Sequence, residues 1–380
     1  METVLITLGR LPKGLELARA LADAGCRVVV ADPFGWHLTR LSRSVARSVR
    51  VTAPNEDVEA FRRDLLAVVA AEAVTRVVPV SEEIFHVAAL ADRLPAGVGL
   101  HAMDPELLLA LHDKLAFARR LVELGLPGPA TFAADDPAAH AFAARAPFVV
   151  KPARASSGHG LSLHGPGEPI PERGQAAVVQ ARLPGEECST FSITYAGRVL
   201  GTVVYRALVL SGTVAVCFER VTAPEAELLA WIETFAARTA FSGFLAFDFR
   251  RDADGRFLPM ECNPRSTSGI HFVEPADLAR ALLDPASLRT LRLREETVLQ
   301  QFFPALTATQ AAALRGEPWR RNLRWLLRCR DVSWQRSDPL PFLLMTPASW
   351  PILARTIFGG MSFGEATTVD VGWYDEGLAR

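Results

Sequence analysis

The sequence lacks any run of 18 apolar residues, so we expect no transmembrane helix. No basic segment precedes an apolar stretch in its opening residues, METVLITLGRLPKG, which argues against a secretory signal peptide. The five cysteines are odd in number and form no C-x-x-C pair, which argues against a disulfide framework and against a structural zinc site. These absences predict a cytoplasmic protein that works in a reducing compartment.

The sequence also has almost no net charge. Its 41 Lys and Arg residues face 42 Asp and Glu residues, which gives a formal net charge of −1. Proteins that bind nucleic acid or an anionic membrane through charge carry a basic excess, so neither partner is predicted. The basic residues are nearly all arginine, which we attribute to the base composition of the genome. The Arg- and Trp-rich stretch 319–330 is interpreted as a packed helix with a solvated basic face, and nucleic-acid binding is the less favoured alternative.

Strand-like and helix-like segments alternate over the first 100 residues. We expect strands at 4–8, 28–31 and 77–80, with helices at 15–25 and 58–72 between them. Such alternation with short connections predicts a doubly wound parallel sheet. After about residue 100 we expect helices at 107–113, 114–124 and 224–239, and short strands in an antiparallel-looking series at 148–151, 177–180, 189–195, 199–205, 213–218, 243–250 and 256–262.

The strongest chemical signal lies on the last two of these strands. If they pair across the turn at 252–255, Asp248 and Glu261 face each other, and Asn263 projects on the same side as Glu261. Two carboxylates and an amide oxygen suit Mg²⁺ that is shared with triphosphate oxygens. Arg265 would stand beside the metal as a fixed cation for a phosphoryl group in transfer. The alternative is a polar hairpin at a sheet edge, which the continuation Asn-Pro-Arg-Ser-Thr-Ser-Gly makes less favoured.

A buried strand delivers Lys151 into a loop of small residues that includes Ser156, Ser157 and Gly158. Such a loop is able to turn several backbone N–H groups toward phosphate oxygens while the lysine neutralises charge. It is not a Walker A loop, because no G-x4-G-K-[ST] occurs, and the glycines near residue 9 form no dinucleotide fingerprint. Taken alone, this loop does not distinguish a phosphate site from an ordinary Ser/Gly turn.

A third segment runs from a strand into a short linker and contains Gln180, Arg182, Leu183 and Glu187. Its backbone groups could pair with an adenine edge, and Glu187 could accept hydrogen bonds from ribose hydroxyls. Taken by itself, the segment is better explained as an ordinary strand-to-turn transition with solvated glutamates.

Together with Lys114, these segments occur in the order and approximate spacing of the ATP-grasp superfamily, and over residues 1–275 the chain resembles the D-alanine–D-alanine ligase, biotin carboxylase and carbamoyl-phosphate synthetase group. The resemblance implies a nucleotide held between two β-layers. It implies that Lys114 and Lys151 contact phosphates, that the backbone near Arg182 and Leu183 holds adenine, and that Glu187 binds ribose. Gln180 stands where that group often has Glu, and no biotin- or glutamine-handling residues are evident.

The same resemblance suggests the domain organisation. It implies an N-terminal α/β domain (1–100), a central ATP-grasp subdomain with the phosphate loop (101–185), a C-terminal ATP-grasp subdomain with the metal site (186–290), and a C-terminal extension (291–380). A closer motif-level similarity to mycosporine-glycine synthetase rests on residues 261–270 and 338–343 and on the opening of the chain. That family attaches glycine to a cyclohexenone through an ATP-activated enol-type oxygen.

Ligands of parallel sheets bind at the carboxyl ends of the strands, where Arg10, Ser81 and Glu82 are predicted to lie. We nominate these three for the substrate, although helix capping explains Ser81 equally well. Further candidates are Arg154, Ser268 and His271, and a lone histidine is more often structural.

The hypothesis favoured by the sequence is an ATP- and Mg²⁺-dependent carboxylate–amine ligase. It would phosphorylate a small acid, join it to an amine and release ADP and phosphate. The alternatives are an enol- or keto-activating amine ligase and a catalytically dead ATP-binding module. The expected partners are small acid and amine substrates, and a homodimer is one assembly open to the chain.

Overall fold

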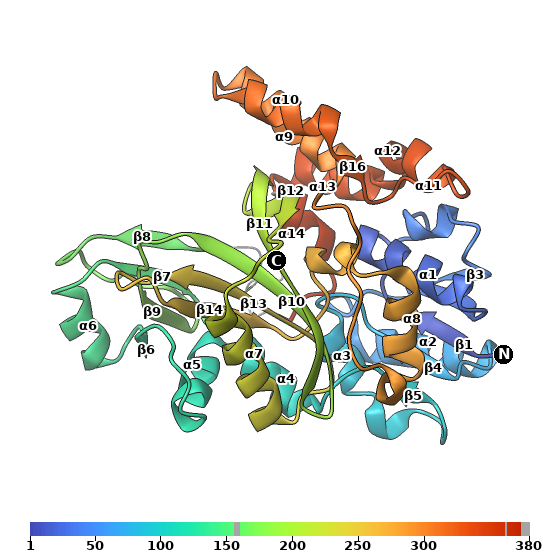
Figure 1. The fold of residues 1–380 in the computed structure, drawn as a ribbon, viewed down its shortest axis with the longest axis horizontal. Coiled ribbons are helices and arrows are strands. Elements are labelled where there is room, and N and C mark those ends of the chain that lie inside the picture. The colour runs from blue at the N-terminus through green and yellow to red at the C-terminus, as the bar shows by residue number, and fades with distance from the viewer. Residues whose placement is uncertain (156–159, 362, 374–380) are drawn as a thin grey trace.

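The computed structural model describes residues 1–155, 160–361 and 363–373. Figure 1 shows a parallel sheet near the N-terminus, a small sheet at the opposite end of the molecule and a large sheet between them. A C-terminal group of helices lies along the upper side in this view. The predicted fold class, a doubly wound parallel sheet followed by antiparallel β-rich parts, is confirmed.

The N-terminal sheet is parallel throughout and has the strand order β3-β2-β1-β4-β5. Alternate residues of a strand point to opposite faces, and the core divides in the same way. Val4 and Ile6 pack in one cluster with α1, whereas Leu5 packs in another with α2. The strands are β1 (Thr3–Ile6), β2 (Arg27–Asp32), β3 (Arg47–Arg50), β4 (Arg76–Val78) and β5 (Gly99–Leu100), and the helices are α1 (Pro12–Asp23), α2 (Val58–Ala71) and α3 (Ile84–Ala88).

Local sequence explains where α1 begins and ends. Pro12 is its first residue, a position where the fixed φ of proline suits the helix and its missing N–H is not needed. Gly25 follows the last turn with φ +85°, a left-handed conformation that glycine adopts at little cost. β1 ends at Ile6, two residues earlier than predicted, and α1 begins at Pro12, three residues earlier than predicted. Lys13 therefore falls in the first turn of α1, at the carboxyl end of the sheet.

Two capped helices lead into the small sheet. The carboxylates of Asp104 and Asp113 accept hydrogen bonds from backbone N–H groups in the first turns of α4 (Pro105–His112) and α5 (Lys114–Glu123). The sheet is antiparallel, with the order β6-β9-β7-β8. It consists of β6 (Thr131–Ala133), β7 (Phe148–Pro152), β8 (Ser162–His164) and β9 (Ala177–Ala181), with α6 (Pro137–Ala143) packed against it. The sequence did not predict β6, β8 or α6, which are too short to show a clear period.

The large sheet has the order β14-β13-β10-β11-β12-β15-β16, and its pairs are antiparallel except for β15 with β16. Helix α7 (Ala226–Thr239) packs Trp231 against Phe247 and Phe249. Asp248, which lies between these phenylalanines, therefore points to the other face of the sheet. The strands are β10 (Glu187–Tyr195), β11 (Arg198–Ser211), β12 (Val214–Arg220), β13 (Gly243–Arg251), β14 (Phe257–Asn263), β15 (Val298–Gln300) and β16 (Arg330–Asp331).

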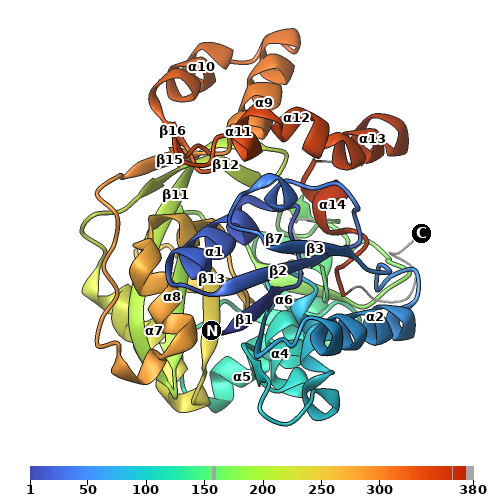
Figure 2. The same cartoon turned by 90° about the vertical axis from the view of Figure 1, so that its right-hand side faces the viewer.

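Residues from 291 onward contribute β15 and β16 to the large sheet, so the extension is built into the rest of the fold. Figure 2 shows α11 to α14 on the side of the molecule where the N-terminal sheet lies. Arg19 on α1 donates to Asp338 of the extension at 2.9 Å, which links the extension to the N-terminal domain. The remaining helices are α8 (Pro275–Leu283), α9 (Phe302–Leu314), α10 (Trp319–Arg328), α11 (Leu340–Leu343), α12 (Met345–Ala348), α13 (Trp350–Gly359) and α14 (Phe363–Thr368), with short 3-10 turns at Thr39–Leu41, Ala91–Arg93, Ser268–Phe272 and Pro285–Ser287. No helix in the described part of the chain is long and apolar enough to cross a membrane.

Candidate functional site

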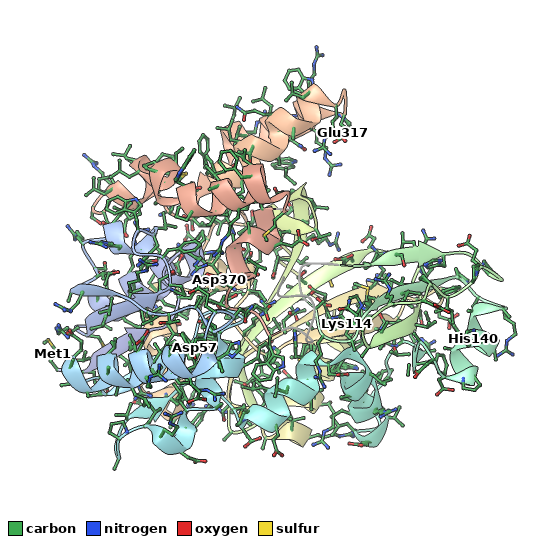
Figure 3. All side chains as sticks on the ribbon, turned by 180° about the vertical axis from the view of Figure 1, so that it is seen from behind. Met1, Asp57, Lys114, His140, Glu317 and Asp370 are labelled. Atoms are coloured by element: carbon green, nitrogen blue, oxygen red, sulfur yellow. The ribbon has the colours of Figure 1, made fainter. Side chains whose placement is uncertain are left out.

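A cleft of about 910 Å³ lies where the three sheets and the extension meet. Its lining includes the predicted phosphate, adenine and metal residues of the two antiparallel sheets, strand-end residues of the N-terminal sheet, and apolar residues of the extension. Lys114 lies in the middle of the molecule, between Met1 on one side and His140 at the outer end of the small-sheet part (Figure 3).

Two carboxylates face each other on neighbouring strands of the cleft wall. Asp248 on β13 pairs in register with Glu261 on β14, as the sequence predicted. Asp248 accepts hydrogen bonds from the Ser189 hydroxyl at 2.6 Å and from the Asn263 amide at 3.0 Å. Burial, together with the charge of Glu261, raises the pKa of Asp248 to about 7. The two carboxylates repel each other, and a cation bound beside them would stabilise both negative charges.

Two lysines, Lys114 and Lys151, place positive charge near Glu261 of this pair. The ammonium of Lys114 lies 3.6 Å from Glu261, and it donates to the carbonyl of Ala155 at 2.6 Å. Lys151 donates to the carbonyl of Met260 at 3.2 Å, and burial lowers its pKa to about 8. Burial alone would raise the pKa of Glu261, but the charges of Lys114 and Lys151 outweigh it and lower that pKa to about 2. The predicted loop residues Ser156, Ser157 and Gly158 lie outside the described residues.

Arg265 connects the predicted metal-site residues with the N-terminal sheet. Its guanidinium donates to the Asn263 amide oxygen at 2.9 Å and forms an ion pair of 2.6 Å with Glu82. Both Arg265 and Glu82 line the cleft, although the Glu82 side chain is only 2% exposed. Glu82, nominated from the sequence for substrate, therefore meets the cleft as the partner of Arg265.

The predicted adenine segment follows β9 along the cleft. Gln180 is buried and donates to the carbonyl of Met260 at 3.3 Å and to the hydroxyl of Thr131 at 3.1 Å, which ties the small sheet to β14. Arg182 and Leu183 lie in the linker to β10 and line the cleft. Glu187, at the start of β10, also lines it and forms an ion pair of 3.0 Å with Arg250.

The remaining substrate nominations fall into two groups. Ser81, Ser268 and His271 line the cleft, and the His271 ring is hydrogen-bonded to Glu16 at 2.9 Å. Arg154 lies outside the lining residues and donates to Asp113 at 3.0 Å.

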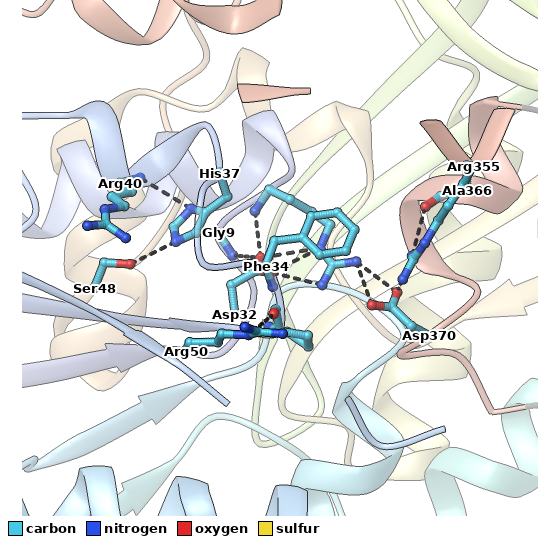
Figure 4. Close-up of polar contacts among 12 residues, drawn as sticks. Gly9, Asp32, Phe34, His37, Arg40, Ser48, Arg50, Arg355, Ala366 and Asp370 are labelled. Atoms are coloured by element: carbon cyan, nitrogen blue, oxygen red, sulfur yellow. Dashed lines mark hydrogen bonds and ion pairs between the residues drawn. The ribbon is translucent and has the colours of Figure 1, made fainter. Parts of the chain in front are cut away.

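Arg10, which the sequence nominated for substrate, is paired with two carboxylates of the protein. Its buried guanidinium donates to Asp32 at 2.8 Å and to Asp370 at 2.7 Å, and it stacks on the ring of Phe34 at 3.5 Å. Figure 4 shows Asp32, Phe34, Asp370 and Arg355 around this contact. Arg10 also lines the cleft, and because carboxylates occupy its guanidinium we infer that it fastens the extension to the N-terminal sheet. Its nomination for substrate stays a prediction.

Lys13 is a cleft residue that the sequence analysis did not single out. Its ammonium donates to the Ser81 hydroxyl at 3.1 Å and to the Ser266 carbonyl at 2.7 Å, which places it beside Arg265. The extension was missed as a cleft wall as well: Phe303, Met345 and Ile352 belong to the lining. A signal for Lys13 was present in the sequence, because lysine occurs at only three positions of the chain.

The donor set fits a magnesium ion that is shared with a nucleotide. Asp248, Glu261 and the amide oxygen of Asn263 are hard oxygen donors on one wall. Among the described residues there is no cluster of three or more His, Cys, Asp or Glu side chains that could hold a metal ion without other ligands. Two carboxylates with phosphate oxygens are the usual protein environment of Mg²⁺.

The fold matches that of solved structures. The chain has an ATP-grasp fold. N5-carboxyaminoimidazole synthetase from Staphylococcus aureus superposes with a TM-score of 0.61 at 14% identity, over 83% of this chain and 86% of that one. Biotin carboxylase from Campylobacter jejuni gives a TM-score of 0.61 at 14% identity, over 77% of this chain and 73% of the other. L-amino acid ligase from Bacillus licheniformis gives 0.56 at 14% identity, over 77% and 75%.

Other structures of this group were solved with nucleotide bound, among them the synthetase from Staphylococcus aureus with ADP. No protein-family model and no curated protein sequence matches the chain. At these identities the structural likeness establishes the fold, and the motif-level similarity to mycosporine-glycine synthetase stays a prediction.

Proposed function

We propose that the protein is an ATP- and Mg²⁺-dependent ligase that phosphorylates a small carboxylic acid and couples the resulting acyl-phosphate to an amine. The observation that carries the proposal is the opposition of Asp248 and Glu261, with Lys114 3.6 Å from Glu261 and Arg265 bonded to Asn263. A protein that merely held ATP would need neither a metal-binding pair nor a cation on its substrate side, which argues against a catalytically dead module.

In this proposal, each group in the cleft has a separate task. The linker at Arg182 and Leu183 would hold adenine, and Glu187 would hold ribose. Lys114 and Lys151 would bind phosphate oxygens, since both ammonium groups face the carboxylate pair. Asp248, Glu261 and Asn263 would hold Mg²⁺, which neutralises charge on the β- and γ-phosphates.

Arg265 would stand where the acid meets the γ-phosphate. An oxygen of the acid attacks the γ-phosphorus, the bond to the β–γ bridging oxygen breaks, and ADP leaves. The amine nitrogen then attacks the acyl carbon, phosphate departs with the bonding electrons, and the nitrogen loses a proton. A guanidinium held in place by Glu82 and Asn263 stabilises the charge that develops on the transferring group, at no cost of reorganisation.

One observation favours a second candidate, in which an enol oxygen is phosphorylated instead of a carboxylate. Two of the three arginines that favoured a carboxylate are engaged elsewhere: Arg10 with Asp32 and Asp370, and Arg154 with Asp113. An enolate spreads its charge over a ring and suits an apolar wall, such as the one that Phe303 and Met345 provide.

Two measurements test these proposals. Chromatography of the spent nucleotide should show ADP and phosphate, because in this proposal the lysines and the carboxylate pair would act on the terminal phosphates. AMP as the main product would contradict the ligase proposal in either form. Hydroxylamine added without the amine should trap an acyl-phosphate as a hydroxamate. If ATP is consumed and no hydroxamate forms, the carboxylate candidate is wrong and the enol candidate is favoured.

A further inference from the structure

Lysine is rare in this chain, and its few positions coincide in space. Of the 41 basic residues, only Lys13, Lys114 and Lys151 are lysine, and the other 38 are arginine. All three line the same cleft, although they are up to 138 positions apart in the sequence. In a chain that otherwise uses arginine for positive charge, a lysine indicates a place that needs a compact ammonium instead of a planar fork. The proposed function gives Lys114 and Lys151 a role in binding phosphate, but it gives no role to Lys13.

The Lys13 ammonium is held firmly by two acceptors. Ser81 follows β4 of the N-terminal sheet, and Ser266 follows β14 of the large sheet, so Lys13 links the two sheets where they line the cleft. Ser266 is itself fixed, because its hydroxyl donates to the carbonyl of Val80. An ammonium has three N–H donors, and two are used here. Within the described residues, the hydrogen bonds of Lys13 leave the third for a ligand in the cleft.

The charges around Lys13 favour a bound anion. Arg265 lies close enough to lower the pKa of Lys13, which burial and that neighbouring charge bring to about 7. The nearby carboxylates are engaged: Glu82 pairs with Arg265, while Glu83 accepts from the Thr7 hydroxyl and from backbone N–H groups of Val80 and Ser81. Two neighbouring cations at a cleft wall repel each other, and an anion that touches both relieves the repulsion.

The wall beside Lys13 is apolar and comes from the extension. Leu38, which precedes a short turn of the N-terminal domain, packs with Leu15 of α1 and Met345 of α12. Phe303 of α9 lies next to Phe363 of α14, with ring centroids 6.4 Å apart. Leu38, Met345, Phe303 and Phe363 all line the cleft. The subsite therefore combines an anion-binding end with a surface that fits an apolar body.

We propose that Lys13, beside Arg265, holds an oxyanion of the molecule to be phosphorylated, and that the extension wall takes up the apolar body of the same molecule. The ligand class is a small, singly charged oxyanion on a ring or aliphatic frame, and a carboxylate and an ionised enol share that chemistry. The proposal rests on the proposed function, since it places the acceptor of the phosphoryl group.

Binding of chosen probes tests this without knowledge of the natural substrate. Ligand-observed NMR would measure benzoate, the enolate of 1,3-cyclohexanedione, neutral benzamide and acetate in the presence of Mg²⁺ and a non-hydrolysable ATP analogue. The variants are Lys13→Met, Lys13→Arg and Phe303→Ala, and calorimetry of the ATP analogue checks each nucleotide site.

For Lys13→Met, the dissociation constant of the anionic ring probes should rise at least about tenfold, as expected for loss of a charge-assisted hydrogen bond. Binding of benzamide should not change, a difference that a merely structural role of Lys13 would not produce. Lys13→Arg should recover part of the anion affinity. Phe303→Ala should weaken benzoate and leave acetate unchanged. Whichever of benzoate and the enolate binds more tightly identifies the source of the oxyanion.

Two failures are distinguishable. If the ATP analogue does not bind the unaltered protein, the proposed function is wrong. If the analogue binds but the anionic probes bind Lys13→Met as well as they bind the unaltered protein, the assignment of Lys13 is overturned and the proposed function stands. Equal losses of benzoate and benzamide would also overturn it, because they would show that the variant disturbs the cleft itself.

Discussion

Replacing Glu261 with Gln separates a magnesium-binding role from a structural one. The amide keeps the shape of the side chain and removes its charge. The charge has two opposed effects on the protein without nucleotide: it attracts Lys114 at 3.6 Å and repels Asp248 across the strand pair. At an effective dielectric constant of 20, two unit charges at that separation interact by about 5 kcal/mol before desolvation is counted. The Glu261 side chain retains 27% of its exposure, so solvent reduces both terms.

Because the attraction and the repulsion offset each other, the free energy of unfolding of Glu261→Gln should change by no more than about 1 kcal/mol. Turnover should respond very differently. Losing one preorganised electrostatic contact to the reacting phosphates typically costs about 10²- to 10³-fold in kcat. We therefore expect a fall of at least about 100-fold in turnover with stability nearly unchanged, together with a weaker response to added Mg²⁺.

The assay is substrate-dependent phosphate release, with acid and amine taken from a screen of small acids and amino acids, alongside urea unfolding. Glu219→Gln on β12 is the matched control, since that side chain is exposed and lies outside the cleft lining. Near-normal turnover in Glu261→Gln would refute the metal-site assignment. A fall in turnover that tracks a loss of stability would refute the separation of roles.

Three further predictions follow from the same contacts. Arg10→Met should lower the free energy of unfolding by about 3–5 kcal/mol, because it leaves the buried Asp32 without its arginine and Asp370 with Arg355 alone; urea titration checks this against Arg320→Met at an exposed position, and equal midpoints would contradict it. The KM for the anionic substrate should rise as the pH passes above about 7, because Lys13, which faces Arg265, Glu82 and Glu83, loses its proton there, whereas Lys13→Arg should give a flat profile over that range. Gly269→Ala should destabilise by about 1–3 kcal/mol, since the added Cβ would lie 2.4 Å from Cβ of Phe191; an unchanged melting temperature would contradict this.

The register of Asp248 and Glu261 could be predicted because it depends on the pairing of neighbouring strands. Asp248 and Glu261 lie on strands that a short turn connects, and side chains alternate along a strand with a period of two. The same rule places Asp248 opposite Phe247 and Phe249, whose aromatic character already marks the buried face. The N-terminal parallel sheet was predictable for a similar reason, since strand–helix alternation leaves few ways to bury the apolar residues.

Contacts between distant segments were beyond such reasoning. Nothing near Arg10 indicates that its guanidinium meets Asp370, which lies 360 positions away and is carried by the extension. Arg154 likewise gave no sign that it would pair with Asp113. A charged residue in a loop looks equally available for a substrate or for a partner, and only its neighbours in space decide between them.

What the sequence determined by itself is the local chemistry: an opposed carboxylate pair on a hairpin, a lysine at the end of a buried strand, and a parallel sheet at the N-terminus. Tertiary structure alone decided which cations at the cleft are paired with carboxylates of the protein, and which residues form the far wall of the cleft. Lys13 reaches the cleft because α1 begins at the strand ends next to Ser266, and the extension closes the cleft because Arg10 and Arg19 bind its carboxylates. Burial and ion pairing act through distances in space, and spacing along the chain carries no record of them.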